Sequence, residues 1–118
     1  MTEQRKANIG PLELEKGGVL QDCSVGYRVF GELNNDHSNV LICPTWFGGT
    51  TQAMIDLGVV GPGKYADTEK YYVIALDALG NGVSSSPAHY AENAMPEFTI
   101  RDMVNSQHRL ITETLGLD

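Results

Sequence analysis

The chain has 118 residues, of which 42% are hydrophobic and 19% are charged. This length and composition predict one folded globular domain and exclude an intrinsically disordered chain. The formal net charge of −7 argues against a nucleic-acid partner, since such a partner requires a basic face. No apolar run reaches the ~18 residues of a membrane-spanning helix. The polar start, Met1 to Lys6, lacks the apolar core of a signal peptide, so we expect a cytoplasmic protein with Cys23 and Cys43 as reduced, buried thiols.

The first thirty residues predict an arm, a hairpin and a strand. Residues 1–11, which end in Gly10-Pro11, are predicted to form a frayed, flexible arm. The alternating residues 12–14 and the following Gly17-Gly18 indicate a short hairpin. Alternation over residues 23–30 predicts a half-exposed strand with one shared face, made by Val25, Tyr27 and Val29.

The stretch VLICPTWFGGT, from Val40 to Thr50, is the centre of the prediction. Its uninterrupted apolar run, Val40 to Cys43, predicts a strand buried on both faces. The following loop holds Gly48 and Gly49, whose bare Cα atoms allow a sharp turn with accessible backbone N–H groups. Such amides at the carboxyl end of a buried strand are how an α/β fold binds an anion or an oxyanion. A plain glycine turn after a core strand fits this stretch equally well.

Two further segments extend the predicted sheet layer. Residues 52–57 are predicted to make a short helical turn, and the apolar run Tyr72 to Leu76 predicts a second buried strand. Asp77 closes that strand, and we expect it to accept backbone N–H bonds from the following turn in preference to a catalytic role. Residues 79–94 are rich in Gly, Asn and Ser and predict a long loop.

Residues 100–115 carry the strongest helix pattern. Thr99 is a suitable N-cap with Asp102 at N3, and Gly116 is a suitable C′ residue. Side chains recurring at helical spacing are predicted to face the core: Ile100, Met103, Val104, Gln107, Ile111 and Leu115. The order of strand, loop, strand, long loop and helix predicts half of an α/β sandwich in a single domain over residues 1–118.

Several short motifs are too incomplete to predict a site. Gly80-Asn81-Gly82 begins like a dinucleotide fingerprint, but Ser85 replaces its third glycine and no helix follows. Residues 82–86, GVSSS, lack the last glycine of the G-x-S-x-G nucleophile elbow, so we expect Ser84 to be a loop residue. The histidines are far apart in sequence (His37, His89 and His108), and no metal site is predicted.

Three stretches together resemble the amino-terminal part of the α/β-hydrolase fold, and specifically the homoserine O-acetyltransferase family. LICPTWFGGT, ending at Thr50, resembles a strand with its oxyanion loop. Residues 71–87, YYVIALDALGNGVSSSP, resemble the next strand with an Asp-x-x-Gly-x-Gly-x-Ser loop, and residues 98–107, FTIRDMVNSQ, resemble the helix before the nucleophile. The resemblance covers residues 12–117 and implies a mostly parallel sheet with an antiparallel amino-terminal arm.

The resemblance implies acyl transfer through a nucleophilic serine, from acetyl-CoA to homoserine in methionine biosynthesis. Acetyl-CoA is then a co-substrate, and no bound cofactor is implied. By this resemblance the Trp46 backbone N–H belongs to the oxyanion hole, and Phe47, Gly48 and Gly49 bind the substrate. The family usually has His-Ala-Leu-Thr-Gly where this chain has PTWFG, from Pro44 onward, which reshapes the acyl pocket. A serine esterase of the same fold, with water as the acceptor, is therefore an alternative.

The resemblance also implies that the chain stops before the nucleophile elbow. In this fold the Ser, Asp and His of the triad come after this point, so we expect the chain alone to be inactive. A complementing chain that carries the triad is one expected partner, beside a small-molecule substrate; a homodimer and a non-catalytic fragment are alternatives. The strand Val40 to Cys43, without its next neighbour, is expected to present an unpaired edge.

Overall fold

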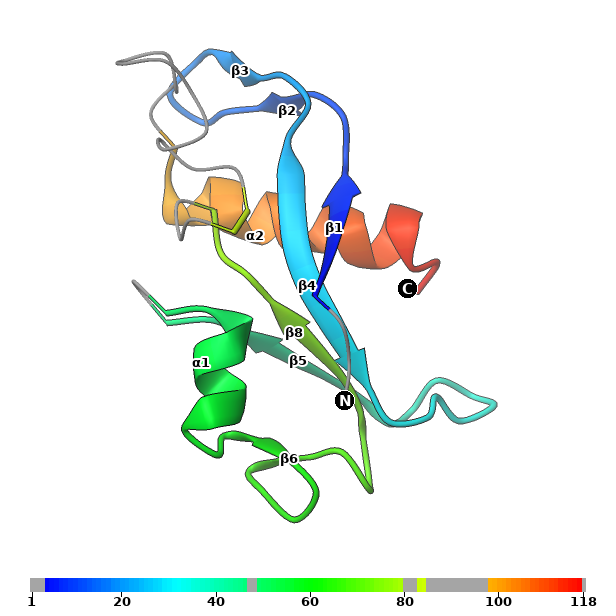
Figure 1. Cartoon of the computed structure of the whole chain (residues 1–118). Coiled ribbons are helices and arrows are strands. Elements are labelled where there is room, and N and C mark those ends of the chain that lie inside the picture. The colour runs from blue at the N-terminus through cyan, green and yellow to red at the C-terminus, as the bar shows by residue number, and fades with distance from the viewer. Residues whose placement is uncertain (1–3, 47–48, 80–82, 85–97, 118) are drawn as a thin grey trace.

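The structure, a computed structural model, describes residues 4–46, 49–79, 83–84 and 98–117. Strands dominate the first half and the last element is helical (Figure 1). The elements in chain order are β1 (Arg5–Asn8), β2 (Leu12–Glu13), β3 (Val19–Leu20), β4 (Ser24–Phe30), β5 (Val40–Pro44), α1 (Thr51–Asp56), β6 (Val60–Gly61), β7 (Ala66–Asp67), β8 (Tyr72–Leu76), α2 (Ile100–Arg109) and the π-helical turn η2 (Leu110–Thr114). The predicted α/β class, the short helix after the glycine pair and the last helix are confirmed.

The central sheet has four strands in the order β1-β4-β8-β5. β4 pairs antiparallel with β1 and with β8, whereas β5 pairs parallel with β8, from Val40 opposite Tyr72 to Pro44 opposite Leu76. The described sheet is thus mixed: the amino-terminal strands supply the expected antiparallel part, and β5 and β8 form the parallel part. Because β5 and β8 run in one direction, their carboxyl ends meet at the same edge of the sheet.

The side chains of β8 alternate between two apolar cores. Ile74 and Leu76 pack in one cluster with Leu110, whereas Val73 and Ala75 pack in the other with Met54 of α1. Helix α2 crosses behind β4 and β1 in the view of Figure 1. Each of these four β8 side chains is almost inaccessible, so the predicted buried strand is confirmed.

Three predictions about the other strands are wrong. Residues 5–8, expected in a frayed arm, form β1, because their backbone pairs with the free edge of β4. The strand predicted to be half exposed, β4, is buried on both faces at its centre, because polar side chains cover Gly26 and Arg28. The strand predicted to be buried on both faces, β5, is an edge strand of intermediate burial, and Ile42 is 44% exposed.

The outer edge of β5 has no neighbour among the described strands, as expected. Ile42 lies opposite Ile74 in the parallel register, so both side chains point to the α2 side of the sheet. An exposed apolar side chain beside an open strand edge favours pairing with another strand. β5 is therefore the place at which this sheet can be extended.

Helix α2 begins with the predicted cap. The Thr99 hydroxyl accepts from the Asp102 N–H at 3.3 Å, and the Asp102 carboxylate accepts from the Thr99 N–H at 2.8 Å, which completes a capping box. The prediction that the whole apolar stripe faces the core is wrong at two positions. Ile100 is 78% exposed and Val104 is 56% exposed, because the helix packs on the amino-terminal hairpin and sheet with other residues, and no described segment covers this side.

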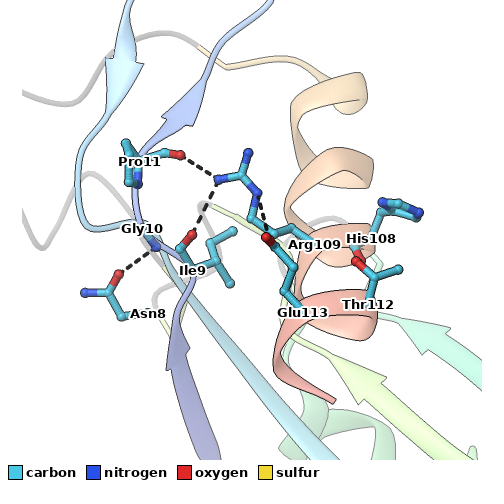
Figure 2. Close-up of polar contacts among 8 residues, drawn as sticks. All are labelled: Asn8, Ile9, Gly10, Pro11, His108, Arg109, Thr112 and Glu113. Atoms are coloured by element: carbon cyan, nitrogen blue, oxygen red, sulfur yellow. Dashed lines mark hydrogen bonds and ion pairs between the residues drawn. The ribbon is translucent and has the colours of Figure 1, made fainter. Parts of the chain in front are cut away.

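The amino-terminal segments are fastened to α2 at both of its ends. The hairpin predicted from Gly17-Gly18 forms, with β2 antiparallel to β3. The Glu15 N–H donates to the Asp102 carboxylate at 2.9 Å. At the other end, the Arg109 guanidinium donates to the carbonyls of Ile9 and Pro11, and its Nε lies 3.4 Å from Glu113 (Figure 2). Ile9 and Pro11 are therefore held by the side chain of a helical residue about a hundred positions further along the chain.

Replacing Arg109 with alanine is expected to lower the free energy of unfolding by about 1 kcal/mol, because two backbone carbonyls lose their charged donor. Arg101→Ala is the matched control, since its ion pair with Glu15 is largely exposed and contributes within about 0.5 kcal/mol. Urea unfolding of the two variants checks this difference. Equal midpoints for both variants would show that the Arg109 contacts do not stabilise the arm.

Candidate functional site

The loop of residues 45–50 starts at the carboxyl ends of the two parallel strands. The Thr45 N–H donates to the Leu76 carbonyl at 3.0 Å. The Thr45 hydroxyl accepts from the Ala78 N–H at 3.1 Å. These bonds continue the β5–β8 pairing beyond the strand ends. The loop therefore begins at the sheet edge where α/β proteins bind their ligands.

Trp46 follows directly and is 44% exposed. Its carbonyl accepts from the Gly49 N–H at 2.9 Å and closes a tight turn. Its own N–H has no hydrogen-bond acceptor within the described parts of the chain. This amide is thus available to a ligand oxygen, as an oxyanion donor must be. Phe47 and Gly48, which were predicted to bind substrate, lie outside the described residues.

Gly49 is buried, and the Trp46 indole is the reason that only glycine fits there. A Cβ atom at position 49 would lie 2.5 Å from Cε2 and 2.6 Å from Nε1 of the indole. These distances are shorter than heavy atoms adopt in packed proteins, so the ring lies directly against the Gly49 backbone. The structure thus brings together two of the predicted site residues, Trp46 and Gly49.

Asp77 lies behind this loop and is fully buried. Its Oδ1 accepts from the Thr51 N–H at 2.9 Å, and its Oδ2 accepts from the Thr51 hydroxyl at 3.1 Å. We expected Asp77 to accept backbone N–H bonds from the turn that follows it. The turn after Asp77 lies partly outside the described residues. The Thr51 N–H belongs to a residue 26 positions earlier, at the first turn of α1, so this carboxylate joins the end of β8 to the end of the 45–50 loop.

Two further polar side chains complete the group, and sequence reasoning missed both. Arg28 is 8% exposed, and its Nε donates to the Thr51 hydroxyl at 3.0 Å while its Nη2 donates to Gln52 at 2.9 Å. Gln4 donates to Asp77 Oδ2 at 3.0 Å. The one available signal was Arg28 itself, a cation in the middle of a strand that is otherwise apolar or small, since a buried cation requires partners.

Ser84 is a structural residue, as predicted. Its hydroxyl accepts from the Gly26 N–H at 2.8 Å and donates to the Asp77 carbonyl. The side chain is fully buried, so it presents no nucleophile to solvent. It fastens the segment after β8 to the middle of β4.

A metal site and a cysteine nucleophile have little support among the described residues. No cluster of His, Cys, Asp and Glu able to hold a metal ion occurs among the described residues, and His89 lies outside them. Cys43 is only half buried, and this burial raises the pKa of its thiol, so at neutral pH it stays protonated and weakly nucleophilic. A search of the described helices finds none with the length and apolarity to cross a membrane.

Solved structures identify the fold, although no family model matches the chain. The acetyl esterase MekB superposes with a TM-score of 0.89 at 37% identity, over 98% of this chain and 34% of that one. A homoserine O-acetyltransferase from Bacillus anthracis superposes with a TM-score of 0.79 at 27% identity, over 99% of this chain and 38% of that one. The chain therefore has the fold of part of an α/β-hydrolase.

Related sequences narrow the class further. The chain is 41% identical over 115 residues to the ethyl acetate hydrolase of Pseudomonas veronii, covering 94% of this chain and 33% of that protein. It is 35% identical over 125 residues to the homoserine O-acetyltransferase of Methanohalophilus mahii, covering 91% of this chain and 26% of that protein. It is thus related to the homoserine O-acetyltransferases and to esterases that share their fold. The chain spans about a third or less of the length of these curated relatives, consistent with the amino-terminal segment that its motifs resemble.

Proposed function

We propose that this chain supplies the oxyanion loop for acyl transfer at a serine nucleophile. The observation that carries the proposal is the Trp46 N–H, which has no acceptor among the described residues and stands beyond the carboxyl end of a parallel strand pair. A donor in this position stabilises the negative charge that develops on a carbonyl oxygen when a nucleophile attacks it. Each such donor lowers the barrier by about 3 kcal/mol.

The nucleophile has to come from outside these residues, because the 118-residue sequence contains no G-x-S-x-G turn. We propose that the strand leading to it pairs with the outer edge of β5. Ile42, exposed on the α2 side, supplies an apolar contact for that strand, and Ile100 and Val104 supply exposed apolar surface on the helix. A strand in this position would end beside the carboxyl end of β5, and so beside Trp46.

The acyl acceptor separates two forms of this proposal. Hydrolysis of an acetyl ester, with water as the acceptor, is favoured by the 40% and 41% identities to a probable esterase of Corynebacterium glutamicum and to the ethyl acetate hydrolase. Transfer from acetyl-CoA to homoserine, a step of methionine biosynthesis, is the second candidate. It is favoured by the string TIRDMV, which begins at Thr99, and by the 35% identity to an acetyltransferase.

Complementation tests the proposal. The chain is co-expressed with the part of the Pseudomonas veronii hydrolase that it does not match, and the purified mixture is assayed with p-nitrophenyl acetate and a fluorophosphonate probe. We expect hydrolysis by the mixture, no hydrolysis by this chain alone, and probe labelling on the added segment. Acetyl-CoA with homoserine, assayed beside ethyl acetate, identifies the preferred acceptor.

Two lysine variants make the test specific. Ile42→Lys places a charge beside the β5 edge and is expected to abolish complementation, whereas Tyr65→Lys places the same charge at a residue that is 94% exposed and should leave it unchanged. Probe labelling of this chain alone would contradict the proposal. So would a stable complex that hydrolyses neither ester.

A further inference from the structure

We infer that Asp77 and Thr51 are positioning residues that fix the end of the loop at residues 49–51 and, through the Gly49 N–H bond to the Trp46 carbonyl, keep the Trp46 N–H in one direction. The inference rests on the proposed function for its catalytic consequence, but its structural part stands on the hydrogen bonds alone. Neither residue is proposed to touch the substrate or to carry a proton.

The two ends of the loop are fastened to three consecutive residues at the end of β8, Leu76 to Ala78. Thr45, at the start, is held by the Leu76 carbonyl at 3.0 Å and by the Ala78 N–H at 3.1 Å. Thr51, just after its end, is held by the Asp77 carboxylate between them, through its N–H at 2.9 Å and its hydroxyl at 3.1 Å. Both ends of the loop are thus bonded to the end of β8, and Asp77 holds the end that has no strand pairing.

The Asp77 carboxylate acts as an acceptor for several donors. Thr51 N–H, Thr51 hydroxyl and Gln4 Nε2 all lie within hydrogen-bond distance of Asp77, and an ionised carboxylate has only acceptors to offer. The Thr51 hydroxyl accepts from Arg28 Nε at 3.0 Å, so its single proton remains for Asp77 or for the Gln4 carbonyl oxygen, which is 3.0 Å away. A buried cation and a buried anion are thereby joined through one threonine hydroxyl.

Altering the Asp77 carboxylate would release one end of the loop. In Asp77→Asn one acceptor becomes an N–H₂ donor, which then faces either the Thr51 N–H or the donors at Oδ2. The bonds between Thr51 and residue 77 are then weakened or lost, whereas the bonds of Thr45 to Leu76 and Ala78 are unaltered. The loop remains attached at its start but loses its fixed end, so the Trp46 N–H samples directions away from the reacting oxygen.

The structural test is amide hydrogen exchange on the 118-residue chain. The reporter is the Gly49 N–H, whose acceptor, the Trp46 carbonyl, is unchanged in every variant. We expect Asp77→Asn and Thr51→Val to accelerate its exchange by about tenfold or more. Thr51→Ser keeps the hydroxyl and should exchange like the parent. The Leu14 N–H, bonded to the Gly18 carbonyl in the distant hairpin, is the internal reference for a general loss of stability.

The catalytic test uses the complemented enzyme. We expect Asp77→Asn to lower kcat for p-nitrophenyl acetate about 100-fold and Thr51→Val about tenfold, with KM and the pH profile unchanged. Because Thr51→Val leaves the Thr51 N–H bond to Asp77 in place, it keeps the test valid if Asp77→Asn does not fold. Unchanged Gly49 exchange in a folded variant would overturn the inference, as would a shifted pH profile. An inactive parent mixture would instead overturn the proposed function, and the exchange experiment would still decide the positioning role.

Discussion

Gly26→Ala is expected to destabilise the chain by about 3 kcal/mol, as overpacking and lost hydrogen bonds combine at one buried point. A Cβ atom at position 26 would lie 2.6 Å from Cγ1 of Val83, 2.8 Å from Oδ2 of Asp77 and 3.0 Å from Nε2 of Gln4. The Gly26 backbone has little room to shift away from them, because it lies near the centre of β4, which pairs with a strand on each side. The displaced carboxylate would also lose its bonds to Thr51.

Gly17→Ala is the matched control for this variant. A Cβ atom there meets nothing within 4 Å, so the cost comes only from its left-handed φ of 88° and is about 1 kcal/mol. Urea unfolding of both variants measures the difference, and exchange of the Gly49 N–H shows whether the loop loosens as well. Equal destabilisation by the two substitutions would mean that the space around Asp77 is not tightly filled.

The local elements were predictable because their signals are local. Thr99 with Asp102 gives a capping box, and Gly17-Gly18 gives a hairpin, through hydrogen bonds between residues a few positions apart. The strand at Tyr72 to Leu76 is buried on both faces, as its uninterrupted apolar run predicts. The resemblance to α/β-hydrolases, carried by three motifs, agrees with the solved structures of that fold.

The errors come from contacts that the local pattern does not contain. The apolar run that starts at Val40 has the composition of a strand inside a sheet. In the described sheet, however, β5 has a neighbouring strand, β8, along one edge only. The group around the fully buried Asp77 joins residues as far apart as Gln4 and Thr51, and no periodicity connects them. Position 49 requires glycine because the Trp46 indole lies against its backbone, whereas the sequence indicated only that a glycine there allows a sharp turn.

Leu110→Ala is the second change expected to have a large effect, at about 3 kcal/mol, since it leaves a cavity between the last helix and the sheet. The Leu110 side chain is fully buried in the cluster that contains Ile74 and Leu76. Val104→Ala is the control on the same helical segment, because Val104 is 56% exposed and its truncation should change stability by no more than about 0.5 kcal/mol. Thermal or urea unfolding of the two variants gives both values, and a Val104→Ala variant as unstable as Leu110→Ala would contradict the exposed position of Val104.

The exposed side chain of Val104 also allows a test of whether the outer surface of α2 is covered in the complemented enzyme. A charge at Val104 should be tolerated by this chain alone, because the side chain already meets solvent. If a further segment covers α2 when it pairs with β5, Val104→Asp should weaken complementation by about tenfold or more, since it would bury an unpaired carboxylate. Tyr65→Asp, in the loop between β6 and β7 at a residue that is 94% exposed, introduces the same charge on a different element and should have no effect. Equal complementation by the two aspartate variants would mean that the docking surface ends at the β5 edge and leaves α2 uncovered.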